Sequence, residues 1–376
     1  MNLKYLIKIY NTILKNTFSM KRQLLIILLM ILISCSAKLK IEQGKLNFSE
    51  ALQSVPKTAK FINSDWFIWG SSMVKSTKDR KYHLYYSRWP KRLGMSAWVT
   101  HSEIAHAVSD SPFGPFEFKD VALTNRGRKY WDGAVTHNPT IHFFSGKYYL
   151  YYMGTTGDTT AENQYWEHRN KQQIGVAVAE SPYGPWQRFD TPLISVSADS
   201  TSFDALMVSN PSVTRMTDGN YLMVYKAVAK KLPMPKGGPV VHLTAIAKNP
   251  NGPFVKQMKP IFTAKDAEFP AEDPYVWRQG DFYYAIVKDM YGAFTDIGRS
   301  LVLFYSNDGM NWKLAENPLV SKIEINWEND TVQKVLALER PQLFFENGKP
   351  IALLCAVNET HDHSFNVQIP LKLMNR

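Results

Sequence analysis

His137-Asn138-Pro139-Thr140-Ile141 leads through the turn Ser145-Gly146-Lys147 into Tyr148-Tyr149-Leu150-Tyr151-Tyr152. Both flanks are rich in β-branched and aromatic residues, and a glycine-containing turn separates them, so the stretch predicts a β-hairpin. Similar stretches return at 209–225, 272–286 and 339–354, and a copy without the proline lies at 69–86. The sequence therefore repeats one hairpin five times.

The repeat has a regular length. Its five copies align on Gly70, Asn138, Asn210, Asp273 and Arg340, which lie 63 to 72 residues apart. After each of the first four hairpins comes a third β-like run, a turn rich in Gly and usually Pro, and an aromatic residue that opens a fourth run, as in Ala177–Trp186. Four strands in each of five units predict an all-β, five-bladed β-propeller with four antiparallel strands per blade. A sandwich would not repeat at this length, and a β-helix would repeat at far shorter intervals.

The last unit lacks the Pro/Gly turn. The run Phe365–Ile369 is the candidate closing strand of this blade, and its pairing cannot be read from the sequence.

The N-terminal segment looks like an export signal. Residues 1–34 hold five basic side chains and no acidic one, and the apolar run 24–33 is too short for a permanent membrane helix. Cys35 directly follows, as in a bacterial lipobox, and is the expected site of lipidation. We therefore expect a signal peptide at 1–34, with Met20 as an alternative start, a linker at 35–58 and the propeller at 59–376. The expected location is the bacterial cell envelope, through a lipid anchor in the membrane.

The net charge excludes one class of partner. Without the five basic residues of the signal, the chain keeps 39 Lys and Arg against 33 Asp and Glu. This mild excess, without a basic run or a helix-turn-helix pattern, gives no reason to expect nucleic-acid binding. The second cysteine, Cys355, lies in an apolar run and reads as a buried thiol.

The hairpin at 137–152, followed by Ser181-Pro182-Tyr183-Gly184-Pro185-Trp186, resembles glycoside hydrolase family 43 and its five-bladed relatives. These relatives act on fructans, arabinosides and anhydro-galactosides, and the likeness covers about residues 60–376. The resemblance implies an inverting glycosidase, with a general base in blade one, a pKa-modulating Asp in blade three and a general-acid Glu in blade four.

Carried over by position, these three roles fall on Asp65, Asp204 and Glu272. Asp273 stands where the family has Gly after its acid, and Asp204 lies farther from its proline than the family's Asp. Asp65 precedes a copy without the family's Asp-Pro. Such a set suits the chemistry, because inversion needs one protonated and one ionised carboxyl group, and a third carboxylate keeps the acid protonated.

Further residues are candidates for substrate binding: Trp69, Asp132, His137, Trp166 and Arg340. Asp132 stands six residues before Asn138, the same offset as Asp204 before Asn210, so the two share a structural role or Asp132 serves the substrate or the chemistry. His137 is also an alternative acid. Arg340, beside Glu339 at the start of blade five, either orients a carboxylate or sugar through its planar fork or forms a structural ion pair.

The connections between second and third strands should overhang the site. They lie near 88–100, 154–173, 226–240 and 288–299, and hold eleven basic and five acidic residues with aromatic side chains between them. This composition favours an anionic oligosaccharide substrate. The sequence predicts an exo-acting glycosidase that requires no cofactor or metal, and it leaves open a structural ion in the central channel. The alternatives are a surface glycan-binding lipoprotein and a glycoside phosphorylase or transferase.

Overall fold

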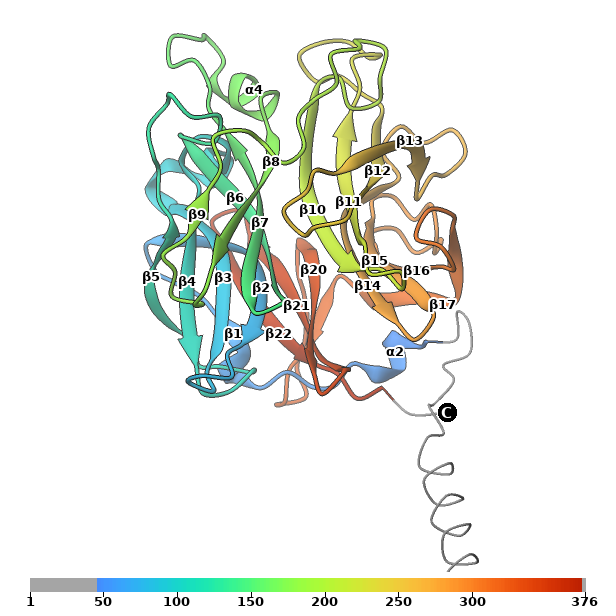
Figure 1. Cartoon of the computed structure of the whole chain (residues 1–376). Coiled ribbons are helices and arrows are strands. Elements are labelled where there is room, and N and C mark those ends of the chain that lie inside the picture. The colour runs from blue at the N-terminus through green and yellow to red at the C-terminus, as the bar shows by residue number, and fades with distance from the viewer. Residues whose placement is uncertain (1–45, 374–376) are drawn as a thin grey trace, which may run out of the picture. The chain divides into compact units, whose positions relative to one another are not determined.

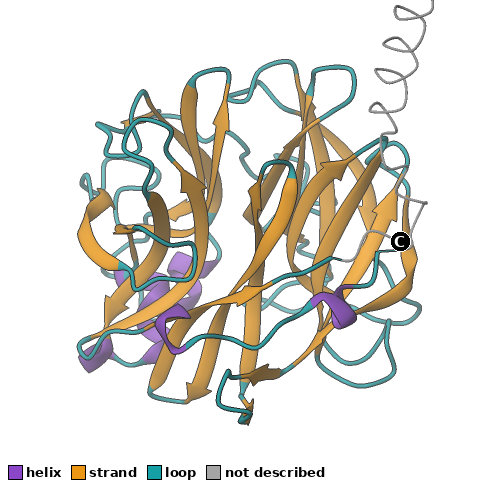
Figure 2. Cartoon of the chain, turned by 90° about the horizontal axis from the view of Figure 1, so that it is seen from below, coloured by secondary structure: helices purple, strands orange, loops and turns teal. Residues whose placement is uncertain are grey.

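The computed structural model describes residues 46–373, and its regular structure is almost entirely β-strand (Figures 1 and 2). Five four-stranded antiparallel sheets follow one another along the chain. Four of them use four consecutive strands, with the first strand of each at one edge. The predicted all-β, five-bladed propeller is therefore confirmed.

The first four blades have the following strands. Blade one has β2 (Trp66–Lys75), β3 (Tyr82–Pro90), β4 (Glu103–Ser109) and β5 (Glu117–Leu123). Blade two has β6 (Val135–Phe144), β7 (Lys147–Thr155), β8 (Gln173–Ala179) and β9 (Gln187–Arg188). Blade three has β10 (Met207–Arg215), β11 (Tyr221–Val228), β12 (Val240–Ala247) and β13 (Val255–Ile261). Blade four has β14 (Ala271–Gln279), β15 (Phe282–Asp289), β16 (Ser300–Ser306) and β17 (Trp312–Lys322).

The fifth blade joins the two ends of the described chain. Its order is β20 (Ala337–Glu346), β21 (Lys349–Thr360), β22 (His363–Pro370) and β1 (Lys60–Phe61). The predicted closing run at 365–369 lies in β22, which pairs with β21, and the outer strand comes from the N-terminal side instead. Because one sheet contains strands from both ends, the ring of blades is closed by backbone hydrogen bonds.

The remaining elements are short. The strands β18 (Glu324–Asn326) and β19 (Val332–Lys334) form a separate hairpin. The α-helices are α2 (Phe48–Ala51), α3 (Trp98–His101) and α4 (Gln164–Arg169), and 3-10 turns span Lys57–Ala59, Lys91–Leu93 and Met95–Ala97. None of the helices in residues 46–373 has the length and hydrophobicity to span a bilayer.

The chain just before β1 packs against the propeller. Phe48 is fully buried, and its ring meets that of Trp277 edge-on at 5.9 Å. Val55 and Ala59 belong to the same apolar cluster, which joins blades four and five. The described part of the predicted linker, residues 46–58, is thus part of the folded unit. The predicted signal at 1–34 and Cys35 lie outside the described residues.

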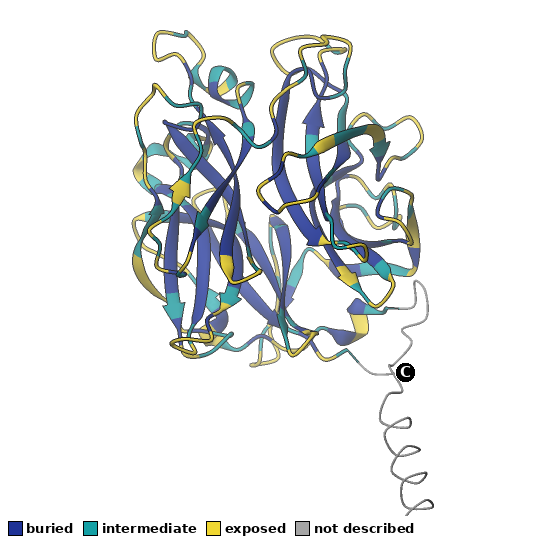
Figure 3. Cartoon of the chain, in the orientation of Figure 1, coloured by how far each residue is buried: buried dark blue, intermediate teal, exposed yellow. Residues whose placement is uncertain are grey.

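Apolar side chains between neighbouring sheets form the core, and Figure 3 shows that most residues of the strands are buried. Leu84 and Tyr86 of blade one, for example, pack with Ala352 and Leu354 of blade five. The predicted buried thiol, Cys355, is fully buried in the next cluster. A single blade cannot bury both of its faces, so the blades depend on one another for their stability.

Three buried histidines predict that the fold loses stability in acid. Burial lowers the pKa of His106 and His242 to about 3 and that of His137 well below its usual value. These side chains are neutral when folded but take up protons near pH 6.5 when unfolded, so their stabilisation is complete above pH 6.5 and lost as the pH falls towards 3. We expect each to cost about 2 kcal/mol at pH 5, measured as the difference between urea unfolding at pH 7.5 and pH 5.

The variant His242→Gln is the control for this effect. It removes one of the buried histidines whose pKa is lowered, so the loss between the two pH values should shrink by about 2 kcal/mol. Equal free energies of unfolding at both pH values in the wild-type chain would contradict the prediction.

Candidate active site

The inner strand of every blade has the same irregularity. Its register with the second strand shifts at the repeat position that the alignment identified. All five residues there adopt left-handed backbone angles, with φ between 48° and 55°: Gly70, Asn138, Asn210, Asp273 and Arg340. Asn, Asp and Gly are the residues that tolerate this conformation best, which explains their use at four of the five positions.

These five residues form what we call the axial ring. Asn138 Nδ2 donates to Asn210 Oδ1 at 2.8 Å, and Asn210 Nδ2 donates to Asp273 Oδ1 at 2.7 Å. The backbone N–H and Nη1 of Arg340 donate to the Asp273 carboxylate at 3.2 and 3.3 Å. Gly70 completes the ring, since a Cβ there would lie 3.2 Å from Arg340 Cγ and 3.3 Å from Asn138 Oδ1. Hydrogen bonds thus tie blades two to five together at the centre, and Gly70 of blade one packs against Asn138 and Arg340.

A second polar layer lies two residues further along the inner strands. Ser72 Oγ donates to Gln342 Oε1, and Gln342 Nε2 donates to Thr140 Oγ1, each at 3.1 Å. Thr140 belongs to blade two and Gln342 to blade five, which are not neighbours, so the two side chains meet across the axis. Hydrogen-bonded side chains therefore form a floor beneath the ring.

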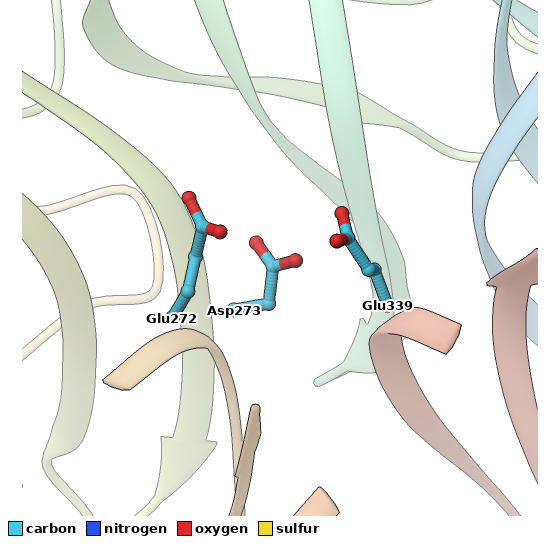
Figure 4. A group of neighbouring side chains, drawn as sticks. All are labelled: Glu272, Asp273 and Glu339. Atoms are coloured by element: carbon cyan, nitrogen blue, oxygen red, sulfur yellow. The ribbon is translucent and has the colours of Figure 1, made fainter. Parts of the chain in front are cut away.

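The residues directly before the ring positions lie near the start of the inner strands, on the other side of this floor. They are Trp69, His137, Ser209, Glu272 and Glu339. The predicted Trp69, His137, Glu272 and Arg340 are thus brought together at the axis. Figure 4 shows the carboxyl groups of Glu272, Asp273 and Glu339 facing the same space. One carboxyl oxygen of each residue lies within 4.8 Å of one oxygen of each of the other two.

Two lysines from second strands balance this acidic cluster. Lys226 in β11 places Nζ 2.8 Å from Glu272 Oε1. Lys288 in β15 places Nζ 3.3 Å from Glu272 Oε2 and also forms an ion pair with Glu339. Lys288 is only 4% exposed. Neither Glu339 nor Lys288 has a role that the sequence alone predicts, although the pairing of Glu272 with Lys288 across β14 and β15 is readable once the register is known.

The pKa values of the two glutamates are shifted in opposite directions. Burial raises the pKa of Glu339, Lys288 opposes this only in part, and Glu272 and Asp273 raise it further. Burial also raises the pKa of Glu272, but Lys226 and Lys288 together outweigh burial and hold it well below its usual range. Neighbouring carboxyl groups with pKa values pushed apart are typical of an acid and an ionised partner in catalysis.

His137 presents a neutral ring to the site. Burial lowers its pKa well below the usual value, and Arg340 and Lys226 lower it further. Its Nδ1 lies 2.7 Å from Ser102 Oγ, and its ring stacks on Trp98 with centroids 4.8 Å apart. Within residues 46–373 no hydrogen bond reaches Nε2. The neutral imidazole suits hydrogen bonding to a ligand better than the alternative role of acid.

Aromatic residues of the overhanging connections extend this surface. Helix α4 begins after Asn163, whose side chain caps the N–H of Trp166 at 3.2 Å. Trp166 is half-buried, and Tyr165 beside it meets Trp98 edge-on at 6.5 Å. The guanidinium of Arg169 lies 5.5 Å from the Trp166 ring. The predicted Trp166 thus belongs to an aromatic wall from blades one and two, and α4 stands at the top of Figure 1.

Asp132 and Asp204 take the same structural position in their blades. Both are fully buried. Asp132 accepts a hydrogen bond from Tyr152 at 2.6 Å and pairs with Arg188 in β9, and Asp204 pairs with Lys256 in β13 at 2.6 Å. β9 and β13 are the outermost strands of their sheets. Both carboxylates therefore fix the chain before the inner strand to the outer edge of its blade, and neither belongs to the axial acidic cluster.

Asp65 lies in the exposed turn before β2, where Ser64 Oγ donates to its side chain at 3.2 Å. It is not part of the cluster, and blade one brings Trp69 and Gly70 to the axis instead. The catalytic roles assigned to Asp65 and Asp204 thus have no counterpart in the contacts of these residues, because their positions before the inner strands lead away from the axis. Glu272 alone of the predicted catalytic set reaches it.

Comparisons with known proteins agree with this fold. No family model and no curated protein matches the sequence. Among solved structures, a glycoside hydrolase matches at 14% identity and a TM-score of 0.64, over 88% of this chain and 94% of that one. A family 117 glycoside hydrolase from the marine bacterium Zobellia galactanivorans matches at 18% identity and 0.57, over 85% and 89%. A thermostable family 43 glycoside hydrolase matches at 15% and 0.57, over 82% and 91%. The predicted resemblance is confirmed at the level of the fold.

The axial ring predicts a large effect of one substitution. Asn210→Gly keeps the left-handed backbone but removes two buried side-chain hydrogen bonds, leaving Asn138 Nδ2 without its acceptor and Asp273 Oδ1 without one donor. We expect a loss of about 2–4 kcal/mol in the free energy of unfolding, measured in urea.

Asn347→Gly is the matched control. Asn347 is also left-handed, with φ of 51°, but lies exposed in the β20–β21 turn. Its substitution should change the free energy by less than about 0.5 kcal/mol. Equal effects of the two substitutions would show that the ring hydrogen bonds add nothing.

Proposed function

We propose that this chain is a glycoside hydrolase acting on oligosaccharides from plant or algal polysaccharides. The observation that carries the proposal is the pair formed by Glu272 and Glu339, whose carboxyl groups face one axial space and share the ammonium of Lys288. The shared fold of family 43 and family 117 glycoside hydrolases supports the same reading. Glycoside hydrolysis uses such a pair, one carboxyl group protonated and the other ionised.

The roles follow from the pKa shifts, which raise the pKa of Glu339 and lower that of Glu272. Glu339, with its raised pKa, donates a proton to the glycosidic oxygen as the bond to the leaving sugar breaks. Glu272, ionised, acts on the positive charge that develops at the sugar carbon. This exchanges the expected role of Glu272 as acid, because two lysines contact its oxygens.

The stereochemical course of the reaction is the next point. One oxygen of Glu272 and one of Glu339 lie within 4.8 Å of each other, and Lys288 contacts both carboxyl groups. Inverting enzymes keep their carboxyl groups roughly 6.5–9.5 Å apart to admit a water molecule, whereas retaining enzymes bring them to about 5–5.5 Å. Inversion stays a prediction from the resemblance, and the first-formed anomer of the product tests it.

An anionic sugar is the substrate that the charges favour. Three acidic side chains, Glu272, Asp273 and Glu339, face four basic side chains at or beside the axis: Arg169, Lys226, Lys288 and Arg340. Arg169 is close enough to Glu272 that this carboxylate counters the lowering of its pKa by burial. The excess of positive charge would attract a uronate or sulfate group. Exo-action and the lipid anchor at Cys35 stay predictions from the sequence alone.

Binding without hydrolysis is the second candidate. One observation favours it: ion pairs already engage both carboxylate oxygens of Glu272, and blade one brings no carboxylate to the axis. A chain of this kind would bind oligosaccharides without turnover.

Substitution of the glutamates separates the two candidates. Glu272→Gln and Glu339→Gln should each lower kcat at least about 1,000-fold on the aryl glycosides and plant or algal oligosaccharides that the wild-type chain cleaves, because each removes an essential proton donor or carboxylate. Product analysis by chromatography gives the rates, and NMR identifies the first-formed anomer.

Glu346→Gln, which changes a half-buried residue paired with Lys75 at the end of β20, far from the axial cluster, is the control and should keep wild-type rates. Full activity of either active-site variant would refute the assignment of that residue. Binding by the wild-type chain without any cleavage would favour the second candidate.

The basic residues in the connection between β11 and β12 predict salt-sensitive binding of an acidic ligand. Replacing the exposed Lys230, Lys231 and Lys236 by Gln should weaken binding of an acidic oligosaccharide about 10-fold at low salt, and less at 300 mM NaCl, because screening shortens the reach of exposed charges. Calorimetry with an acidic and a neutral oligosaccharide measures this. Replacement of Lys78, Lys119 and Lys313, which are exposed elsewhere, is the control. A uniform loss for both ligands would argue against charge recognition.

A further inference from the structure

We propose that Lys288 is a positioning residue, a built-in cation that holds Glu272 and Glu339 as a working acid and base pair. This inference rests on the proposed function for its catalytic meaning, whereas the cation that it places at the cluster is a feature of the fold alone. It concerns the one group of three acidic side chains within residues 46–373 whose oxygens lie within 4.8 Å of one another.

The position of Lys288 follows from sheet register. In blade four it is the cross-strand partner of Glu272, so both side chains leave the sheet side by side. Its Nζ contacts Glu272 Oε2 at 3.3 Å and reaches across to Glu339, which begins the inner part of blade five. One ammonium group therefore bridges the two glutamates and ties two blades together at the axis.

No other cation at the axis makes this bridge. Lys226 from β11 contacts Glu272 alone, and Arg340 from β20 contacts Asp273 alone. The charged groups that face Lys288 are Glu272 and Asp273 from β14 and Glu339 from β20. Burial lowers the pKa of Lys288, but these three carboxyl groups outweigh burial and raise it above its usual value. Lys288 thus stays charged over the working pH range and is no proton donor itself.

The bridge explains how three carboxyl groups share one space. Like charges at this distance in a partly buried site repel strongly, and such clusters are normally held by a metal ion or kept protonated. Here the ammonium supplies the positive charge. It lies closest to Glu272 and Glu339, where it favours the ionised form of Glu272, while burial and the repulsion from Glu272 and Asp273 raise the pKa of Glu339.

Removal of the charge is the first test. Lys288→Met should raise the pKa values of both glutamates, so the pH profile of kcat/KM on a substrate of the wild-type chain should move to higher pH by about one unit or more. Lys288→Arg keeps the charge and should leave the profile within about 0.3 unit of the wild type, even with a lower kcat. Lys226→Met is the matched control and should move mainly the acidic limb, which reports Glu272. Equal shifts for Lys288→Met and Lys288→Arg would overturn the proposal.

The second test does not depend on activity. Without the ammonium, the three carboxyl groups form an open acidic cluster, so Lys288→Met should bind about one Mn²⁺ or Ca²⁺ per chain in calorimetry while the wild type and Lys226→Met bind none at this cluster. The double variant Lys288→Met/Glu339→Gln should bind the ion at least about 10-fold more weakly. Binding of equal strength in the wild type, or no binding in a folded Lys288→Met chain, would overturn the proposal. Absence of hydrolysis in the wild type would instead refute the proposed function and leave this titration to decide the place of Lys288.

Discussion

The axial ring is the constraint on which the rest of the structure depends. Five blades can close only if their inner strands approach one point, and at that point each backbone must turn sharply enough to avoid its neighbours. The left-handed residue in each inner strand provides the turn, and the side chains of Asn138, Asn210, Asp273 and Arg340 convert it into hydrogen bonds between blades. Gly70 is needed because Arg340 and Asn138 already fill the space that its side chain would take.

The ring also builds the site. Because the chain bulges at the ring residue, the residue just before it lies at the axis. This one position in the repeat supplies Trp69, His137, Glu272 and Glu339. Their charge states then depend on the second strands, since Lys226 and Lys288 stand beside the inner strands at the same height. The chemistry therefore comes from paired strands within a blade and from contact between blades, and no single loop carries it.

The sequence predicts the fold well because every blade repeats the same hairpin pattern. Hairpin phrases at equal intervals fix five sheets, and the aligned positions Gly70 to Arg340 are the ring itself. Residues next to those positions, such as Glu272 and His137, were placed correctly for the same reason. Asp204 was not, because an offset of six residues in an irregular segment does not tell which way a side chain points; for Asp132, the contacts agree with the alternative of a structural role shared with Asp204. The two-residue strand β1 was too short to recognise, and Lys288 could be found only through the register of its partner strand.

The site is asymmetric although the fold is not, and this asymmetry indicates how a sugar would lie. Aromatic side chains, Trp98, Tyr165 and Trp166, come from blades one and two, and His137 stacks among them. The carboxyl groups and lysines come from blades three to five. Sugar rings stack on aromatic faces while the bond to be cleaved must meet the acid, so the ligand must extend from the wall over blades one and two to the cluster over blades four and five.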